Sequence, residues 1–327
     1  MNKRPLKPAL FKAYPELEAK LPWLKLGCLP TPVQQISGVG FPDVWIKRDD
    51  LSAKAYGGNK VRKLEFVLAQ VNQQRKAHVI TFGGIGTNHG LATAIYANQL
   101  SLRCTLVLFP QPVTSLVKQN LRLFKYYGAR LVYRSSVVKA VLTYYLTQRL
   151  RYPGAYFLFA GGSNAVGTLG FVSAAFELQA QIEAGDMPKP SVIICPVGSN
   201  GTLAGLTLGA HLAGLDCTII GVRVSFSHCG PLQSCTPATV RKLMQQTYNL
   251  LQKRMPGLAS NALPLPNMWN DYVGNGYGCP TVAGQQAYRL LKDKQQIVLD
   301  PTYTAKTFAA VLDLSLIHIS EPTRPTT

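Results

Sequence analysis

The feature that most constrains the fold is a regular alternation of short apolar, β-branched runs with stretches of helical period. The runs that predict strands are residues 44–47, 79–82, 105–109, 130–133, 156–159, 192–197 and 218–224. The stretches that predict helices are residues 60–75, 88–100, 114–127, 137–150, 167–182, 202–213, 238–254 and 281–292. Such an alternation is typical of parallel sheets joined by right-handed crossovers. With 327 residues, the chain is long enough for two domains. We therefore predict an α/β fold of two domains, each an open, mostly parallel sheet flanked by helices.

Three of the predicted strands end in glycine-rich turns that lead into helices, at residues 81–90, 159–164 and 196–205. The start of a helix offers unpaired N–H groups and partial positive charge, which suit a phosphate. The third turn is the best candidate, because its glycines allow close approach and its hydroxyls add donors. Its residues are Gly198, Ser199, Asn200, Gly201 and Thr202. The turn is neither a Walker A loop nor a G-x-G-x-x-G fingerprint, and a tight turn without a ligand is the alternative.

A lysine follows two glycines at the predicted start of the helix 60–75. Gly57 and Gly58 let the backbone pass close to a ligand, and Lys60 then stands in the first helical turn. If Lys60 is partly desolvated and crowded by Arg62 and Lys63, its pKa falls and its neutral, nucleophilic fraction grows. Such an amine forms a Schiff base with an aldehyde. A solvated lysine after a glycine turn is the alternative.

The first glycine-rich turn ends in three consecutive polar residues, Thr87, Asn88 and His89. Their position at the start of the helix 88–100 supplies donors suited to a carboxylate or a phenolate oxygen. The alternative is a turn that serves packing only.

The charge of the chain is high and uneven. It has 34 Lys and Arg against 15 Asp and Glu, and residues 66–176 contain no acidic residue. This block should attract small anions. Nucleic acid is the rival partner, but the cations are spread along the block and no nucleic-acid motif accompanies them. We therefore expect no nucleic acid as a partner.

Cysteine usage and hydropathy bear on the compartment. The seven cysteines form no C-x-x-C pair and are odd in number, which favours reduced thiols in the cytoplasm over a metal site. We expect no metal. No apolar run approaches the length of a membrane span, and the basic N-terminal segment does not read as a secretory signal, so no membrane partner is expected.

Several motifs occur together in a fixed order. They are W-I-K-R-D-D-L at 45–51, G-G-N-K-x-R-K-L-E at 57–65, G-G-I-x-T-N-H at 83–89, G-S-x-G-T-x-A-G at 198–205, G-Y-G at 276–278 and L-D-P-x-Y-T-x-K at 299–306. In this combination the chain resembles the 1-aminocyclopropane-1-carboxylate deaminase and D-cysteine desulfhydrase family. These are pyridoxal-phosphate enzymes of the tryptophan-synthase-β-like fold, fold type II.

The resemblance implies roles for the matching positions. Lys60 would bind pyridoxal 5′-phosphate as a Schiff base and later move the Cα proton of the substrate. Asn88 would hydrogen-bond the ring oxygen of the cofactor. The turn from Gly198 through Ser199, Asn200 and Gly201 to Thr202 would hold the phosphate.

The same resemblance implies the residues that face the substrate. Thr87 and His89, with Asn88 beside them, would hold the substrate carboxylate. Tyr303 would pack on the pyridine ring and Tyr277 would line the substrate side, so that Lys60, Thr87, Tyr277 and Tyr303 would be the catalytic residues. For each tyrosine, a core aromatic with a bonded hydroxyl is the alternative.

Two departures from the family pattern bear on the reaction. Thr87 stands where the family commonly has Ser, and Thr304 stands where aminocyclopropane deaminases have Glu. A carboxylate at position 304 would keep the pyridine nitrogen protonated, and a threonine cannot. Thr304 would contact the cofactor without supplying a carboxylate. This favours β-elimination, which needs less carbanion stabilisation than ring opening.

The predicted function is a D-cysteine desulfhydrase-like α,β-elimination that gives pyruvate, ammonia and sulfide from a small amino acid. Aminocyclopropane-carboxylate deamination and D-serine deamination stay open, as does a non-catalytic protein that binds the cofactor or nucleic acid. The family also implies a homodimer.

The predicted large domain joins residues 1–65 to residues 166–313, with residues 66–165 as a small domain inserted between them and the site in the cleft. Residues 314–327 resemble translated adapter DNA from library preparation, with a genuine short tail as the alternative. If they are an artefact, the native chain continues past residue 313 and should be more stable and more active.

Overall fold

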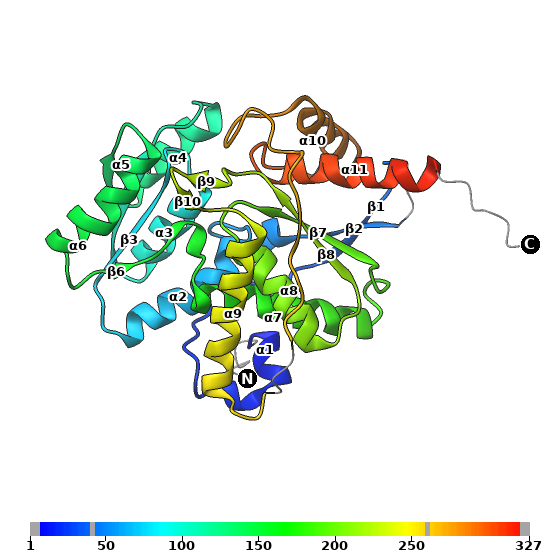
Figure 1. Ribbon diagram of the computed structural model, residues 1–327, viewed down its shortest axis with the longest axis horizontal. Helices are drawn as coiled ribbons and strands as arrows, with labels where there is room; N and C mark the ends of the chain where they lie inside the picture. Colours follow the sequence, from blue (N-terminus) through cyan, green and yellow to red (C-terminus); the bar gives the residue numbers. More distant parts are fainter. Residues whose placement is uncertain (1–6, 40–42, 259–261, 321–327) are drawn as a thin grey trace, which may run out of the picture.

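The protein contains two separate parallel sheets, seen in a computed structural model that describes residues 7–39, 43–258 and 262–320. A four-stranded sheet has the order β5-β4-β3-β6, and a three-stranded sheet has the order β11-β8-β7. Every pair within the two sheets is parallel. In Figure 1 the four-stranded sheet and its helices occupy the left of the molecule, with α10 and α11 at the upper right. The predicted α/β class is confirmed.

The four-stranded sheet is built from one continuous stretch of the chain. Its strands are β3 (His78–Gly84), β4 (Arg103–Phe109), β5 (Arg130–Tyr133) and β6 (Tyr156–Phe157). Its helices are α3 (Asn88–Gln99), α4 (Ser115–Tyr126), α5 (Val137–Leu142) and α6 (Gln148–Arg151). A π-helical turn, Thr143–Thr147, separates α5 from α6, so the single helix predicted over 137–150 is interrupted. All residues of β3 are buried, which places this strand at the centre of the unit.

The three-stranded sheet is packed against longer helices. Its strands are β7 (Val192–Val197), β8 (Thr218–Arg223) and β11 (Asn267–Trp269). The helices around it are α1 (Ala9–Ala13), α7 (Ala165–Glu183), α8 (Gly201–Ala213), α9 (Pro237–Arg254), α10 (Val282–Gln295) and α11 (Thr304–Ser320). The largest apolar core joins α1, α7, α8 and α9 to this sheet. Neither β11 nor α11 was predicted from the sequence.

One predicted strand does not join a parallel sheet. β2 (Val44–Lys47) pairs antiparallel with β1 (Val33–Ile36). β1 was not predicted from the sequence. The connection between the two strands is too short for a crossover, so the chain can only turn back on itself. A second antiparallel pair is formed by β9 (His228–Cys229) and β10 (Leu232–Gln233). Short 3-10 turns complete the chain at Pro15–Leu17, Asp49–Leu51 and Ala160–Gly162.

Polar caps fix where most helices begin. In six helices the side chain before the first helical residue accepts a hydrogen bond from a backbone N–H of the first turn, which satisfies one orphan donor. These caps are Thr87, Thr114, Ser136, Asn164, Thr236 and Thr281.

Helix α2 (Lys60–Gln73) connects the two units. Val61, Leu64 and Leu68 pack with β3 and α3 of the four-stranded unit. The opposite side lies against α7, where a Cβ on Gly170 would come within 2.2 Å of the Arg62 carbonyl oxygen. Glycine at this position therefore permits the close approach of the two helices. The first turn of α2 is held between both units.

Each sheet lies within one of the predicted domain segments, but the exact bounds at 65 and 165 stay a prediction. Helix α11 extends past residue 313 to Ser320, and residues 321–327 lie outside the described part of the chain. The artefact hypothesis for residues 314–327 stays a prediction. Within the described residues, no helix has both the length and the apolar character needed to cross a membrane.

Candidate active site

A large cavity of about 1370 Å³ lies between the two sheets. The turns after β3 and β7 open into it, as expected for carboxyl ends of parallel strands. All of the predicted site residues line it except Gly201, which lies just behind its wall at the start of α8: Lys60, Thr87, Asn88, His89, Gly198, Ser199, Asn200, Thr202, Tyr277, Tyr303 and Thr304. The structure therefore brings together residues from five separate segments of the chain.

Lys60 is the first residue of α2 and lies half-buried in this cavity. The preceding turn needs a glycine, because Gly58 has a φ of +105°. The Lys60 Nζ donates to Asn59 Oδ1 at 3.0 Å and lies 6.0 Å from the centre of the Tyr303 ring. Burial lowers the pKa of Lys60 to about 8, although the negative charge of Asp300 works in the opposite direction. The amine is therefore more easily deprotonated than an ordinary lysine.

The turn between β7 and α8 forms a polar pocket. Asn200 adopts a φ of +69°, and α8 begins at the next residue. The Ser163 hydroxyl donates to Ser199 Oγ at 2.9 Å and accepts from the Gly201 N–H at 3.3 Å. Thr202 Oγ1 accepts from Asn59 Nδ2 at 3.3 Å, so the turn is tied to the residue before Lys60. Backbone N–H groups and hydroxyls thus converge at the positive end of α8, an arrangement that could hold a phosphate.

Lys63 lies beneath this turn and was not predicted as a site residue. Its Nζ donates to Ser163 Oγ at 3.1 Å and to the Gly161 carbonyl at 3.2 Å. A Cβ on Gly201 would lie 2.8 Å from that nitrogen, so any larger residue there would displace the Lys63 amine. Burial, and then the charge of Lys60, lower the pKa of Lys63 well below its usual value. The spacing of three residues after Lys60, one helical turn, is the signal that could have indicated it.

Thr87 and His89 flank Asn88 at the start of α3. Thr87 Oγ1 caps the helix by accepting from the Gly90 N–H at 3.2 Å, which leaves its own O–H free to donate. The His89 Nε2 lies 2.9 Å from Thr81 Oγ1, and its buried Nδ1 has no hydrogen-bond partner among the described residues. Burial lowers the pKa of His89 well below its usual value, and the charges of Lys60 and Lys63 add to the effect. His89 is therefore neutral near pH 7.

Asn88 contacts two side chains that the sequence did not indicate. Its Nδ2 donates to Asp300 Oδ2 at 2.7 Å, and its Oδ1 accepts from Asn120 Nδ2 at 3.2 Å. Asp300 was quoted only as part of a motif, without a role. The contact crosses the cavity from α3 to the residues just before α11.

The tyrosines meet on the side of the cavity formed by α11 and the loop before α10. The Tyr277 and Tyr303 hydroxyl oxygens are 2.7 Å apart. The loop that carries Tyr277 is held by Lys306, whose Nζ donates to the carbonyls of Val273 at 2.7 Å and Gly276 at 3.2 Å. Thr304, predicted to contact the cofactor, is exposed and its Oγ1 accepts from the Asp300 N–H at 2.7 Å.

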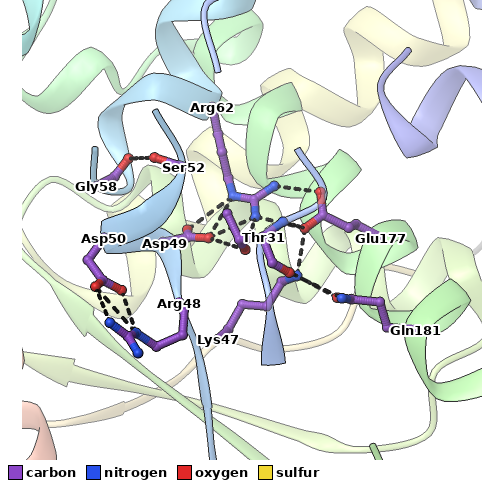
Figure 2. A network of polar contacts seen from close by, with 10 residues as sticks. All are labelled: Thr31, Lys47, Arg48, Asp49, Asp50, Ser52, Gly58, Arg62, Glu177 and Gln181. Carbon is purple, nitrogen blue, oxygen red and sulfur yellow. Dashed lines mark hydrogen bonds and ion pairs between the residues drawn. The ribbon is translucent and has the colours of Figure 1, made fainter. Parts of the chain in front are cut away.

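A buried ionic network holds the first turn of α2 from behind (Figure 2). Arg62 bonds Asp49 at 2.7 Å and Glu177 at 2.9 Å, while Lys47 bonds Glu177 at 2.6 Å. Thr31 accepts from Arg62 at 2.9 Å. The network joins β2, the turn after it, α2 and α7. It therefore fixes the position from which Lys60 reaches the cavity.

The residues of the cavity fit pyridoxal phosphate. An aldehyde needs an amine with a lowered pKa, which Lys60 provides. A phosphate needs convergent donors and a positive potential, which the N–H groups and hydroxyls of the turn before α8 and the positive end of that helix provide. The unpartnered Nδ1 of the buried His89 is a further polar atom of a residue that lines this cavity. Across the described parts of the chain, no group of three or more His, Cys, Asp or Glu is placed to hold a metal ion.

Comparison with known proteins agrees with this geometry. Residues 24–322 match the family model described as "pyridoxal-phosphate dependent enzyme". The D-cysteine desulfhydrase of Salmonella paratyphi A is 32% identical over 308 residues, covering 90% of this chain and 88% of that protein. The D-cysteine desulfhydrase of Salmonella newport is also 32% identical, over 305 residues and the same shares of each chain.

Two solved structures share the fold. The crystal structure of an ACC deaminase homologue superposes with a TM-score of 0.81 at 29% identity, covering 96% of this chain and 91% of that one. The fungal L-serine ammonia-lyase from Rhizomucor miehei has a TM-score of 0.62 at 17% identity, covering 90% and 89%, and shows a likeness of fold alone. The family resemblance expected from the motifs is confirmed.

Proposed function

Because this chain belongs to the pyridoxal-phosphate dependent enzymes, we propose that it is a lyase that eliminates sulfide from D-cysteine. One D-cysteine and one water would give one pyruvate, one ammonia and one hydrogen sulfide. The Cα–H and Cβ–S bonds break, and water replaces the amine at Cα. The relatives named D-cysteine desulfhydrase support this substrate.

Bound pyridoxal phosphate supplies a conjugated electron sink for the negative charge that develops at Cα. Lys60 takes the Cα proton, and with a pKa of about 8 its amine has a usable neutral fraction near physiological pH. The Thr87 hydroxyl and the start of α3 hold the substrate carboxylate. Asn88 would donate to the ring oxygen of the cofactor, and the turn from Gly198 to Thr202 would hold its phosphate.

The paired tyrosines would protonate the departing sulfur. Burial raises the pKa of Tyr277 to about 12 and that of Tyr303 well above its usual value. Both phenols therefore keep their protons and act as donors. The hydrogen bond between the two hydroxyls lets Tyr303 share its proton as Tyr277 gives one up.

The single observation that carries the choice of elimination is Thr304. Its neutral side chain, which accepts a hydrogen bond from the Asp300 N–H, occupies the position at which the family resemblance implies a glutamate that would strengthen the electron sink. Without that carboxylate, a reaction in which a leaving group removes the negative charge is favoured over ring opening. Deamination of 1-aminocyclopropane-1-carboxylate is the second candidate, supported by the similarity to the ACC deaminase homologue. D-serine deamination is a third candidate of the same elimination type.

The test is a substrate panel on purified protein supplied with pyridoxal phosphate. D-cysteine should release sulfide and pyruvate in equal amounts, and the cyclic amino acid should release little 2-oxobutyrate. Lys60→Ala should abolish turnover, and Lys54→Ala, which changes an exposed lysine nearby, should not. Faster release of 2-oxobutyrate would favour the second candidate. No turnover of any substrate would point to a protein that only binds its cofactor or nucleic acid.

The partners and compartment follow from the same proposal. The protein would act as a homodimer in the cytoplasm, bind a small amino acid and require no nucleic acid. The seven cysteines are all free thiols, which supports a reducing compartment. Light scattering of the purified protein checks the dimer, and a nucleic-acid retention assay at several salt concentrations checks the rival partner.

A further inference from the structure

The carboxylate of Asp300 joins the two sides of the cavity through one side chain, Asn88. Asp300 precedes α11 in the three-stranded unit, and Asn88 is the first residue of α3 in the four-stranded unit. We propose that Asp300 is a positioning residue that closes the cavity and, together with Asn120, orients the Asn88 amide. The orienting role rests on the proposed function, because it concerns an N–H directed at the cofactor. The closing role does not.

The Asp300 carboxylate is held by backbone N–H groups of the residues that follow it. Its Oδ1 accepts from the N–H groups of Thr302 at 2.7 Å and Tyr303 at 3.0 Å. These two bonds fix the plane of the carboxylate, so that Oδ2 is directed at Asn88 Nδ2, 2.7 Å away. A short hydrogen bond to a carboxylate is stronger than one between neutral groups. Its partners are separated by 212 positions in the chain, so it resists separation of the two units.

Only one orientation of the Asn88 amide lets it form both of its hydrogen bonds, to Asp300 and to Asn120. A carboxylate oxygen only accepts, so the Nδ2 end must face Asp300. On the other side, Asn120 Nδ2 also donates to the Gly86 carbonyl at 2.8 Å, so its N–H end is directed toward Asn88 Oδ1. Two bonds, one from each side of the cavity, therefore set the amide. One N–H of Asn88 takes no part in these bonds and is available to a ligand in the cavity.

An exchange of the two side chains tests this arrangement. Asp300→Asn alone places an amide beside an amide, so one of three contacts must be lost: the bond to Asn88, the bonds from Thr302 and Tyr303, or, if the Asn88 amide turns over, the bond from Asn120. Asn88→Asp alone places two carboxylates together. The double exchange, Asn88→Asp with Asp300→Asn, restores every bond, because the amide at position 300 can donate to the carboxylate at position 88. Asn120 can still donate to that carboxylate.

The readout is hydrogen exchange of the first turns of α3 and α11, measured with and without added pyridoxal phosphate. We expect each single variant to exchange about tenfold faster there, as loss of a charged hydrogen bond implies, and the double exchange to return close to the parent protein. Asp216→Asn, at a fully exposed carboxylate, is the control and should change nothing. The closing role is overturned if the single variants show the same hydrogen-exchange rates as the parent protein, or if the double variant does not return to those rates.

The orienting role is tested by cofactor affinity. The double variant keeps the contact across the cavity, so its hydrogen-exchange rates should return to those of the parent protein. It lacks the N–H at position 88, so its dissociation constant for pyridoxal phosphate should rise about tenfold. Asn120→Leu should weaken cofactor binding while the carboxylate of Asp300 stays in place. Parental affinity in both variants would overturn the orienting role. If the proposed reaction is wrong, turnover of D-cysteine is absent but the exchange pattern still holds.

Discussion

The hydroxyl oxygens of Tyr277 and Tyr303 lie 2.7 Å apart at the wall of the cavity and hydrogen-bond to each other. Tyr277→Phe removes the proton donor that we propose for the departing sulfur, and it leaves the Tyr303 hydroxyl without that partner. We expect the kcat for sulfide release to fall by about 100-fold, a usual size for loss of a general acid. Tyr133→Phe, at an exposed position, is the control. A parental kcat in Tyr277→Phe would remove this tyrosine from the reaction.

The lowered pKa of Lys60 makes the stability of the cofactor-free protein depend on pH. The folded value is about 8 and the unfolded value 10.5, so between them the unfolded chain binds more protons. Stability from this group therefore rises with pH across that window, and below about 8 the full cost of burying the charge is present. Lys60→Met should stabilise the protein by up to about 3 kcal/mol at neutral pH, an advantage that disappears by about pH 10.5.

Urea unfolding of both proteins at a series of pH values measures this difference. Lys54→Met, at an exposed lysine, provides the comparison. An advantage of Lys60→Met that does not change with pH would show that the amine titrates normally.

Glycine at position 201 leaves room for the polar groups under the turn. A Cβ there would lie 2.7 Å from Ser163 Oγ and 2.8 Å from Lys63 Nζ, so both groups must move. Gly201→Ala should cost about 1–3 kcal/mol of local packing, and the dissociation constant for pyridoxal phosphate should rise about tenfold. Absorbance titration with the cofactor measures it. At Gly154 a Cβ meets no atom within 4 Å, so Gly154→Ala should bind as the parent does.

Arg62 neutralises two carboxylates that are themselves largely buried. Its replacement by Met removes the cation that Asp49 and Glu177 share and leaves Glu177 with its ion pair to Lys47. The free energy of unfolding should fall by about 3–5 kcal/mol, as for other buried pairs that lose one partner. Adding Glu177→Gln should recover part of this loss, because one unpaired charge is removed. Equal stability of Arg62→Met and the parent in urea would contradict the importance of this network.

Much of the fold could be predicted because its strands and helices carry local signals. Continuous apolar runs marked β3, β4 and β7, and helical periods marked α2 and α3. Helix α11 was missed because both of its sides are buried around residues 305–310, which removes the amphipathic period. β11 has only three residues and lies in a proline-rich segment, so no period could indicate it.

The site was predictable only where its chemistry is local. Lys60 and the turn from Gly198 to Thr202 are each recognisable within a few residues. The bond between Asn88 and Asp300 joins residues 212 positions apart, and the bond between Arg62 and Glu177 joins residues 115 apart. The residues near each of these positions in the sequence do not indicate the partner, because the partner is brought close only when the two units pack together.

The opening turn of α2 places three neighbouring cations in three different surroundings: Lys60 in the cavity, Arg62 in the ionic network and Lys63 under the glycine turn. A rotation of this helix large enough to accommodate a new substrate would disturb all three at once. Attempts to redesign specificity by directed evolution should therefore succeed at cavity residues away from this turn, such as the exposed Phe226 and Tyr145, and should find the turn itself intolerant of change.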